Sequence, residues 1–315
     1  MLSRTADSLF WLARYMERAE NVARILSAGH RMASLSAQTG GVSNEWQSTL
    51  IAAGCAPGYR TVHGEIAAER VIDFLLRDER NPSSILACFE TARRNARQVR
   101  TALTADMWET LNETWLELGK FPLDTASPDA VLRFLEWVKH RSLLFNGAYM
   151  NTMLRNDAFW FVQVGTYLER ADNSARILDV KYHVLLPQGE GVGGPIDHCQ
   201  WESILRAFSA VRAYHWLYNE RMAPWNIAEL LILRPEMPRS LLHCTAQLSE
   251  ALDELASHYG ARAECHRLAG GLHARLRFGR IDAILTAGLH EFLTRFVEDS
   301  ALLGTAITEC YLTAN

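Results

Sequence analysis

The chain carries Tyr15-Met16-Glu17-Arg18-Ala19-Glu20-Asn21-Val22-Ala23-Arg24-Ile25-Leu26, and 152 positions later it carries Tyr167-Leu168-Glu169-Arg170-Ala171-Asp172-Asn173-Ser174-Ala175-Arg176-Ile177-Leu178. Most of the paired residues are identical, and Asp172 keeps the negative charge of Glu20. The interval is nearly half of the 315 residues, far longer than the period of a solenoid repeat. The match instead predicts a unit of about half the chain that occurs twice.

Two more blocks return in the same order. They are Trp46-x-Ser48-x-Leu50-x-Ala52, which matches Trp201-x-Ser203-x-Leu205-x-Ala207, and Val71-x-Asp73-Phe74-Leu75-Leu76, which resembles Ile227-x-Glu229-Leu230-Leu231-Ile232. The shift drifts only from 152 to 156 positions over the three blocks. The sequence therefore predicts an internal duplication, with a first copy at residues 1–150 and a second copy at residues 151–315.

Apolar residues recur at intervals of three and four through most of the chain, which indicates helices rather than strands. Asn81 and Ser127 each precede a proline and are expected to cap helices. The segment from 143 to 186 contains no proline, so we predict one long helix or two nearly continuous helices across the boundary between the copies. We expect an all-α fold, an internally duplicated helical bundle whose two similar halves pack as one body with pseudo-twofold symmetry.

Composition narrows the class of protein. The chain has 49% hydrophobic residues, which suits a globular protein, and it lacks an apolar run of about 18 residues, so we expect no membrane span. The net charge of −4 gives no overall electrostatic attraction to nucleic acid, and we expect none to bind. Six scattered cysteines and an N-terminus unlike a secretory signal predict reduced thiols in the cytoplasm.

The repeated segment places an acid, an amide and an arginine on one helical face in each copy. These residues are Glu17, Asn21 and Arg24 in the first copy and Glu169, Asn173 and Arg176 in the second. In one interpretation the two faces line a polar cleft that binds a zwitterion, a peptide end or a phosphate. In the other, Arg18 and Arg170 each pair with the acid of the other copy and fix how the helices register.

An arginine stripe occurs only in the first copy. Arg93, Arg97 and Arg100 share one helical face, whereas the positions 156 residues later carry no arginine. The stripe can receive an anionic ligand or an acidic partner surface, or it can be a solvated face paired locally with Glu90 and Asp106.

Polar residues also gather just ahead of the second charged motif. Asn151 and Arg155 lie four positions apart and are expected to share a helical face. They either extend the polar lining begun by Glu169 or make hydrogen bonds between helices.

Several chemistries find no support in the sequence. No glutamate has a histidine three residues later, as a dimetal bundle needs, and the zinc-protease, phosphate-loop and nucleophile-elbow motifs are absent. We therefore expect no metal and no cofactor. Cys88 and Cys244 occupy matching positions in the two copies and are interpreted as small core residues.

The opening segment, residues 3–21, resembles the Alpha-E family of bacterial all-helical proteins, which is named for its Glu-Arg motif. Residues 70–85, 93–112 and 168–182 resemble three further hallmarks of that family. Family members are commonly encoded beside, or fused to, a circularly permuted ATP-grasp protein, often with a transglutaminase-like peptidase. The resemblance thus implies a shared task in forming or modifying amide bonds, and it transfers no catalytic residue.

Three functions remain open from the sequence. The chain can be an accessory protein that holds an acidic or peptide substrate for an ATP-grasp ligase. It can be an enzyme acting on an amide or an acyl phosphate, with Glu17 or Glu169 as general base. It can also be a helical scaffold without a ligand. Burial of both carboxylates in mutual ion pairs would argue against the enzyme.

Overall fold

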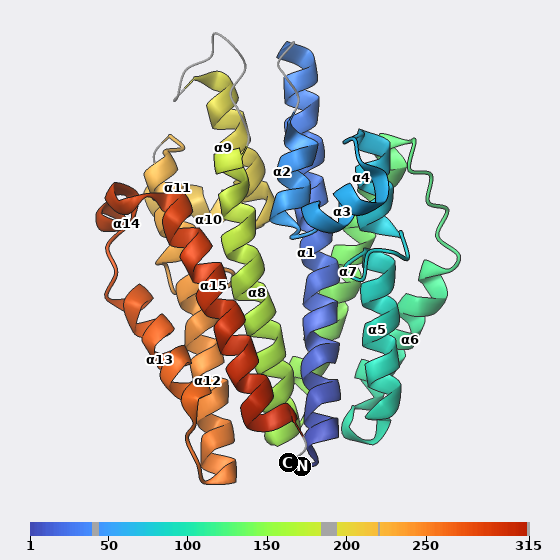
Figure 1. Cartoon of the computed structure of the whole chain (residues 1–315), viewed down its shortest axis with the longest axis vertical. Helices are drawn as coiled ribbons and strands as arrows, with labels where there is room; N and C mark the ends of the chain where they lie inside the picture. Colours follow the sequence, from blue (N-terminus) through green and yellow to red (C-terminus); the bar gives the residue numbers. More distant parts are fainter. Residues whose placement is uncertain (40–43, 184–193, 220, 314–315) are drawn as a thin grey trace.

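Helices make up most of the chain in our computed structural model, which describes residues 1–39, 44–183, 194–219 and 221–313 (Figure 1). These ranges contain no strand, as expected. The elements are α1 (Ser3–Thr39), α2 (Glu45–Ala52), α3 (Ala56–His63), α4 (Ala68–Leu76), α5 (Ile85–Gln98), the 3₁₀ turn η1 (Arg100–Ala102), α6 (Ala105–Leu118), α7 (Pro128–Thr152), α8 (Asp157–His183), α9 (Pro195–Ala207), α10 (Val211–Tyr218), α11 (Pro224–Ile232), α12 (Leu241–Tyr259), α13 (Glu264–Arg277), α14 (Ile281–Ala287), α15 (Leu289–Ile307) and the π-helical turn η2 (Thr308–Leu312).

Two long helices, α1 and α8, lie side by side at the centre of the molecule (Figure 1). Helices α5 and α7 pack against α1, and α12 and α15 pack against α8. The two central helices approach closely at Gly165, where an added Cβ would collide with the carbonyl oxygen of Phe10 and lie 3.1 Å from the Cβ of Ala13. The absence of a side chain at Gly165 therefore sets the separation that the neighbouring charged residues must bridge.

Serine and threonine caps begin several outer helices. Ser127 accepts a hydrogen bond from the amide of Ala130 at the start of α7, as predicted. The prediction for Asn81 is wrong, because Ser84 caps α5 and the Asn81 amide instead donates to the carbonyl of Phe74. Ser240 caps α12 in the same way as Ser84 caps α5.

The segment predicted at residues 143–186 forms two helices rather than one, and its residues 184–186 lie outside the described part of the chain. Helix α7 ends at Thr152, Met153 has extended backbone angles, and α8 begins at Asp157. The chain reverses at this short turn, so α7 and α8 run in opposite directions (Figure 1). Asn151 therefore lies in the last turn of α7 and Arg155 lies in the break itself, so the two do not share a helical face, contrary to the expectation.

A buried tyrosine anchors the turn after a short helix at two places in the chain. Tyr59 donates to the carbonyl of Glu65 and accepts from the amide of Ala67, and both hydrogen bonds bridge α3 to the start of α4. Tyr214 makes the matching pair of bonds between α10 and α11. Both tyrosine side chains are fully buried, and their hydroxyl groups satisfy backbone groups that would otherwise lack partners. None of the described helices combines the length and the apolar character that a membrane span needs.

Candidate functional site

The two Glu-Arg dipeptides pair reciprocally across the contact between α1 and α8. Glu169 accepts hydrogen bonds from Nε of Arg18 at 2.7 Å and from Nη2 of the same arginine at 3.0 Å. Glu17 accepts from Arg170, whose Nε lies 3.2 Å from Oε2. Both carboxylates are buried, at 1% and 2% exposed. Each arginine thus pairs with the acid of the other segment, as one of the two interpretations of the repeat predicted.

Additional arginines surround each buried carboxylate. Nε of Arg14 lies 2.7 Å from Glu169, and Nη1 of Arg239 lies 3.6 Å from Glu17. Neither of these two arginines was among the candidates from the sequence. The central contact therefore holds more positive charge than the repeated motif alone supplies.

Glu20 forms a second buried cluster one turn along α1. Its carboxylate pairs with Arg239, accepts from Nε of Arg24 at 2.8 Å and accepts from the hydroxyl of Ser142 at 2.6 Å. Arg24 also donates to the carbonyl of Ala207 at 2.5 Å. This cluster joins α1 to α7, α9 and the turn before α12, so Arg24 holds helices together rather than facing a cleft.

Arginine charge keeps these carboxylates ionised. Burial alone would raise the pKa of Glu169, but Arg18 and Arg14 outweigh it and lower the pKa to about 2. Burial would also raise the pKa of Glu20, but the charges of Arg239 and Arg24 outweigh this effect and lower the pKa to about 2. A carboxylate with such a pKa is poorly suited to take a proton near neutral pH.

The two matching cysteines are not nucleophiles in this environment. Burial raises the pKa of Cys88 and of Cys244 to about 12, so both thiols stay protonated. Both side chains lie fully buried among apolar residues, in agreement with the interpretation as core residues.

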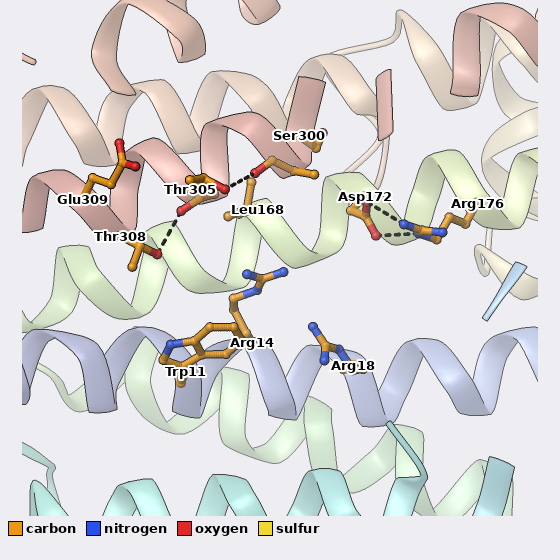
Figure 2. Close-up of a pocket in the computed structure, with 12 residues that line it drawn as sticks. Trp11, Arg14, Arg18, Leu168, Asp172, Arg176, Ser300, Thr305, Thr308 and Glu309 are labelled. Carbon is orange, nitrogen blue, oxygen red and sulfur yellow. Dashed lines mark hydrogen bonds and ion pairs between the residues drawn. The ribbon is translucent and has the colours of Figure 1, made fainter. Parts of the chain in front are cut away.

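A pocket of about 590 Å³ opens beside the central ion pairs, between α1, α8 and α15 (Figure 2). It is lined by Trp11, Arg14, Arg18, Leu168, Asp172, Arg176, Ser300, Ala301, Gly304, Thr305, Thr308 and Glu309. The last two residues come from the π-helical turn that ends α15, an irregularity that is frequent at functional sites. Because the pocket contains both acids and arginines, it can receive charges of either sign.

Arg14 is the arginine most available to a ligand in this pocket. It uses only Nε on Glu169, and its two terminal nitrogens have no hydrogen-bond partner within the described ranges. Its guanidinium lies 4.8 Å from the centre of the Trp11 ring and reaches into the space between the helices (Figure 2). The hydroxyl of Ser300, which is only 3% exposed, is also left without a partner among the described residues.

The two repeated faces are not used alike. Arg176 lies at the pocket and pairs with Asp172 at 2.7 Å, whereas Arg24 is buried. The Asn173 amide donates to Glu169, while the buried amide nitrogen of Asn21 has no partner in the described chain. Of the residues of the two faces only Arg176 lines this pocket, together with its neighbour Asp172 and with Arg18, so this pocket is not the cleft lined by both faces that one interpretation predicted.

The arginine stripe lies away from this pocket, on α5 and η1. Arg97 and Arg100 are exposed, and Arg93 donates to Asn112 at 3.0 Å while its guanidinium packs 5.5 Å from the Trp115 ring centre. Within the described ranges no ion pair joins the stripe to Glu90 or Asp106, the local partners that one of the two interpretations named. Asn151 and Arg155 are also exposed, and neither lines the pocket.

The paired Glu-Arg dipeptides and the helical fold define a class of all-helical domain. The chain belongs to the Alpha-E family, described as a predicted alpha-helical domain with a conserved ER motif, and the family profile matches residues 1–312. The Glu-Arg dipeptides of α1 and α8 are consistent with that description.

The chain is also similar to uncharacterized proteins of Mycobacterium bovis and Mycobacterium tuberculosis. Each is 25% identical over 295 residues, which cover 87% of this chain and 32% of the relative. The chain thus spans about a third of the length of these curated relatives. No solved structure matches it.

Proposed function

We propose that the protein is an accessory protein that holds a peptide or amino-acid substrate by its carboxylate for a ligase of the ATP-grasp type. The main support for this proposal is that Arg14, at the pocket, bonds Glu169 through Nε alone. Glu169 is fully engaged by Arg14 and Arg18, yet the terminal nitrogens of Arg14 remain available to a second carboxylate. Guanidinium groups bind carboxylates and phosphates well, and the acyl phosphate of a ligase reaction presents the same negative oxygens.

The charges around the pocket favour a zwitterion over a simple anion. Arg14 and Arg18 supply the side that suits a carboxylate, while exposed Glu309 supplies a carboxylate that suits an ammonium group. The face of Trp11 and the side chain of Leu168 add apolar surface between them. An amino acid or a peptide end offers this combination of groups.

The family resemblance and the length of the relatives support the proposal of a ligase partner. The mycobacterial relatives have about two thirds of their length outside the matching region, which suits a domain that works beside another. The exposed part of the arginine stripe, Arg97 and Arg100, offers a surface for an acidic patch on such a partner. A transglutaminase-like peptidase would act on the same peptide material.

The carboxylates of the central contact do not favour the alternative of an enzyme with a glutamate base. Glu17 and Glu169 are both buried in ion pairs, and a general base needs a free carboxylate with a raised pKa. The scaffold alternative accounts for the ion pairs but gives no reason for the available nitrogens of Arg14.

ATP consumption by the ligase on acidic peptides, with and without this protein, tests the proposal. We expect stimulation by the wild type and about tenfold weaker peptide binding for Arg14→Gln, because a hydrogen bond to a charged group contributes about 1.5 kcal/mol. Arg212→Gln, on an exposed arginine of α10, is the control and should behave as wild type. Equal peptide binding by both variants would remove the pocket from the proposal.

The arginine stripe is tested separately in the same assay. Arg93→Glu combined with Arg97→Glu should weaken association with the ligase while peptide binding to the isolated protein is kept. Co-purification with the ligase at the wild-type level would show that the stripe is not the docking surface.

We also propose that the chain consists of two duplicated units, residues 1–150 and 151–315, related by a pseudo-twofold axis along the contact between α1 and α8. The reciprocal Glu-Arg pairs support it, and so do the two tyrosine anchors, which lie 155 residues apart. The order of packing around the central helices supports it further, because α5 and α7 stand to α1 as α12 and α15 stand to α8.

A further inference from the structure

A second cluster of side chains lies one to two turns beyond the pocket, near the end of α8. Asp179 and His183 are four residues apart on α8, and His290 comes from the first turn of α15. Nε2 of His183 lies 3.2 Å from one oxygen of Asp179, and Nδ1 of His290 lies 2.7 Å from the other. The potential ligand atoms of all three residues lie within 4.8 Å of one another.

Neighbouring groups hold both histidines in place. The carbonyl of His183 accepts from the amide of Asn44 at 2.7 Å and from the hydroxyl of Ser48 at 2.8 Å, which fixes the end of α8 against α2. The ring of His290 stacks on Tyr182 with 3.8 Å between the ring centres and an angle of 4° between the planes. Preorganisation of this kind is what supporting groups provide around metal ligands.

The three groups face a pocket of about 320 Å³. Its walls are the apolar side chains of Ile51, Leu293 and Val297 together with Arg176, which lines the first pocket as well. The three ligand side chains are 17 to 26% exposed, so an ion can reach them from solvent. A metal ion bound by these three side chains would have room for a water molecule or a substrate group in its remaining coordination position.

We propose that Asp179, His183 and His290 bind a divalent ion of the zinc type. Two imidazoles and one carboxylate are a ligand set that borderline divalent metals prefer, and zinc sites with three protein ligands keep a fourth position open. Zinc–ligand bonds of about 2.1 Å place tetrahedral ligand atoms roughly 3.4 Å apart. The two contacts to Asp179, at 2.7 and 3.2 Å, come within small side-chain movements of that arrangement.

This site was not expected from the sequence, which predicted no metal. Asp179 and His183 have helical spacing, but the third ligand is more than a hundred positions away, and only the packing of α15 on α8 brings it close. The proposed metal site is independent of the proposed substrate-holding function and is tested separately.

Zinc titration by calorimetry tests the site directly. The protein is used full length, without a histidine tag, after treatment with a chelator, and in a Cys310→Ser background that removes the one exposed thiol. We expect one equivalent of Zn²⁺ to bind, and His183→Gln or His290→Gln to weaken binding by at least about 100-fold. His215→Gln, at an exposed histidine on α10, is the control and should bind as the parent does.

Cobalt provides a second readout that does not depend on affinity. Co²⁺ bound by nitrogen and oxygen ligands should give visible absorption bands without a thiolate charge-transfer band, and the visible bands should vanish in His290→Gln. Circular dichroism of each variant establishes that it is folded. The proposal is overturned if the parent protein binds no stoichiometric Zn²⁺, or if both histidine variants bind it as tightly as the parent.

Discussion

The glutamate and the arginine of each Glu-Arg dipeptide form ion pairs with the other central helix and not with each other. Adjacent residues on a helix point in different directions, so Glu17 meets Arg170 and Arg18 meets Glu169 across the central contact. Buried pairs of this kind add little net stability because desolvation offsets their attraction, but removing one partner costs about 3–5 kcal/mol. We therefore expect their main effect to be on the register of α1 against α8.

Acid should weaken this contact. Glu169 has a folded-state pKa of about 2 against an ordinary value of 4.5, so its contribution is present above pH 4.5 and is lost as the pH falls toward 2. That contribution is on the order of 3 kcal/mol. Urea unfolding from about pH 6 to about pH 3 should show the free energy of unfolding falling steeply for the wild type and less steeply for Glu169→Gln.

The control for this experiment is a carboxylate outside the central contact. Glu254→Gln, at an exposed position on α12, should keep the pH dependence of the wild type. A Glu169→Gln variant that loses stability with acid as steeply as the wild type would mean that other groups titrate in this range.

The sequence predicted the reciprocal pairs but not the arginines that complete them. Glu17, Arg18 and their counterparts stand out because they occur twice. Arg14 and Arg239 do not, since the matching positions in the other half carry Thr166 and Ser83. A search for repeated charges therefore finds the symmetric part of the site and misses the part that makes the pocket asymmetric.

Among the helices, α1 and α8 depend on one glycine for their close approach. A methyl group on Gly165 would meet the Phe10 carbonyl, so Gly165→Ala should lower the free energy of unfolding by roughly 1–3 kcal/mol through overpacking. The matched control is Gly147→Ala on α7, where nothing lies within 4 Å of the added Cβ. That change should stabilise the protein by up to about 1 kcal/mol through helix propensity.

Thermal or urea unfolding of the two variants gives the comparison. If the free energy of unfolding falls for Gly165→Ala and rises for Gly147→Ala, then the contact between α1 and α8 decides the effect at Gly165, and the helix propensity of alanine does not. Stabilisation by both substitutions would mean that the central helices can separate without loss.

Helix type was predictable from the sequence, and helix boundaries were less so. The apolar periodicity predicted the helices, and the capping residue Ser127 predicted where α7 begins. The sequence analysis missed the turn at residues 153–156 because this segment contains no proline or glycine. Nothing in the residues around Met153 predicts its extended backbone angles. Tertiary packing accounts for the break, since the reversal allows both α7 and α8 to pack against α1.

For the molecule as a whole, the proposed duplication predicts that the two halves need each other. Buried Glu17 and Glu20 take arginines from the second half, and Glu169 takes both of its arginines from the first. Residues 1–152 or 157–315 expressed alone would leave these charges without partners in an exposed apolar face. Exposed apolar surface forfeits about 25 cal/mol per Å² of lost burial, so opening the contact between α1 and α8 would remove much of the stability of each half.

Co-expression of the two fragments should therefore yield a one-to-one complex, whereas each fragment alone should aggregate or unfold without a cooperative transition. Size-exclusion chromatography and thermal unfolding measure both outcomes. A Glu17→Gln fragment should assemble more weakly, because Arg170 of the other fragment would keep its charge in a buried site without a carboxylate. A cooperative, monomeric transition in either fragment alone would mean that each half is an independent domain, and the central ion pairs would then join two finished structures rather than complete one.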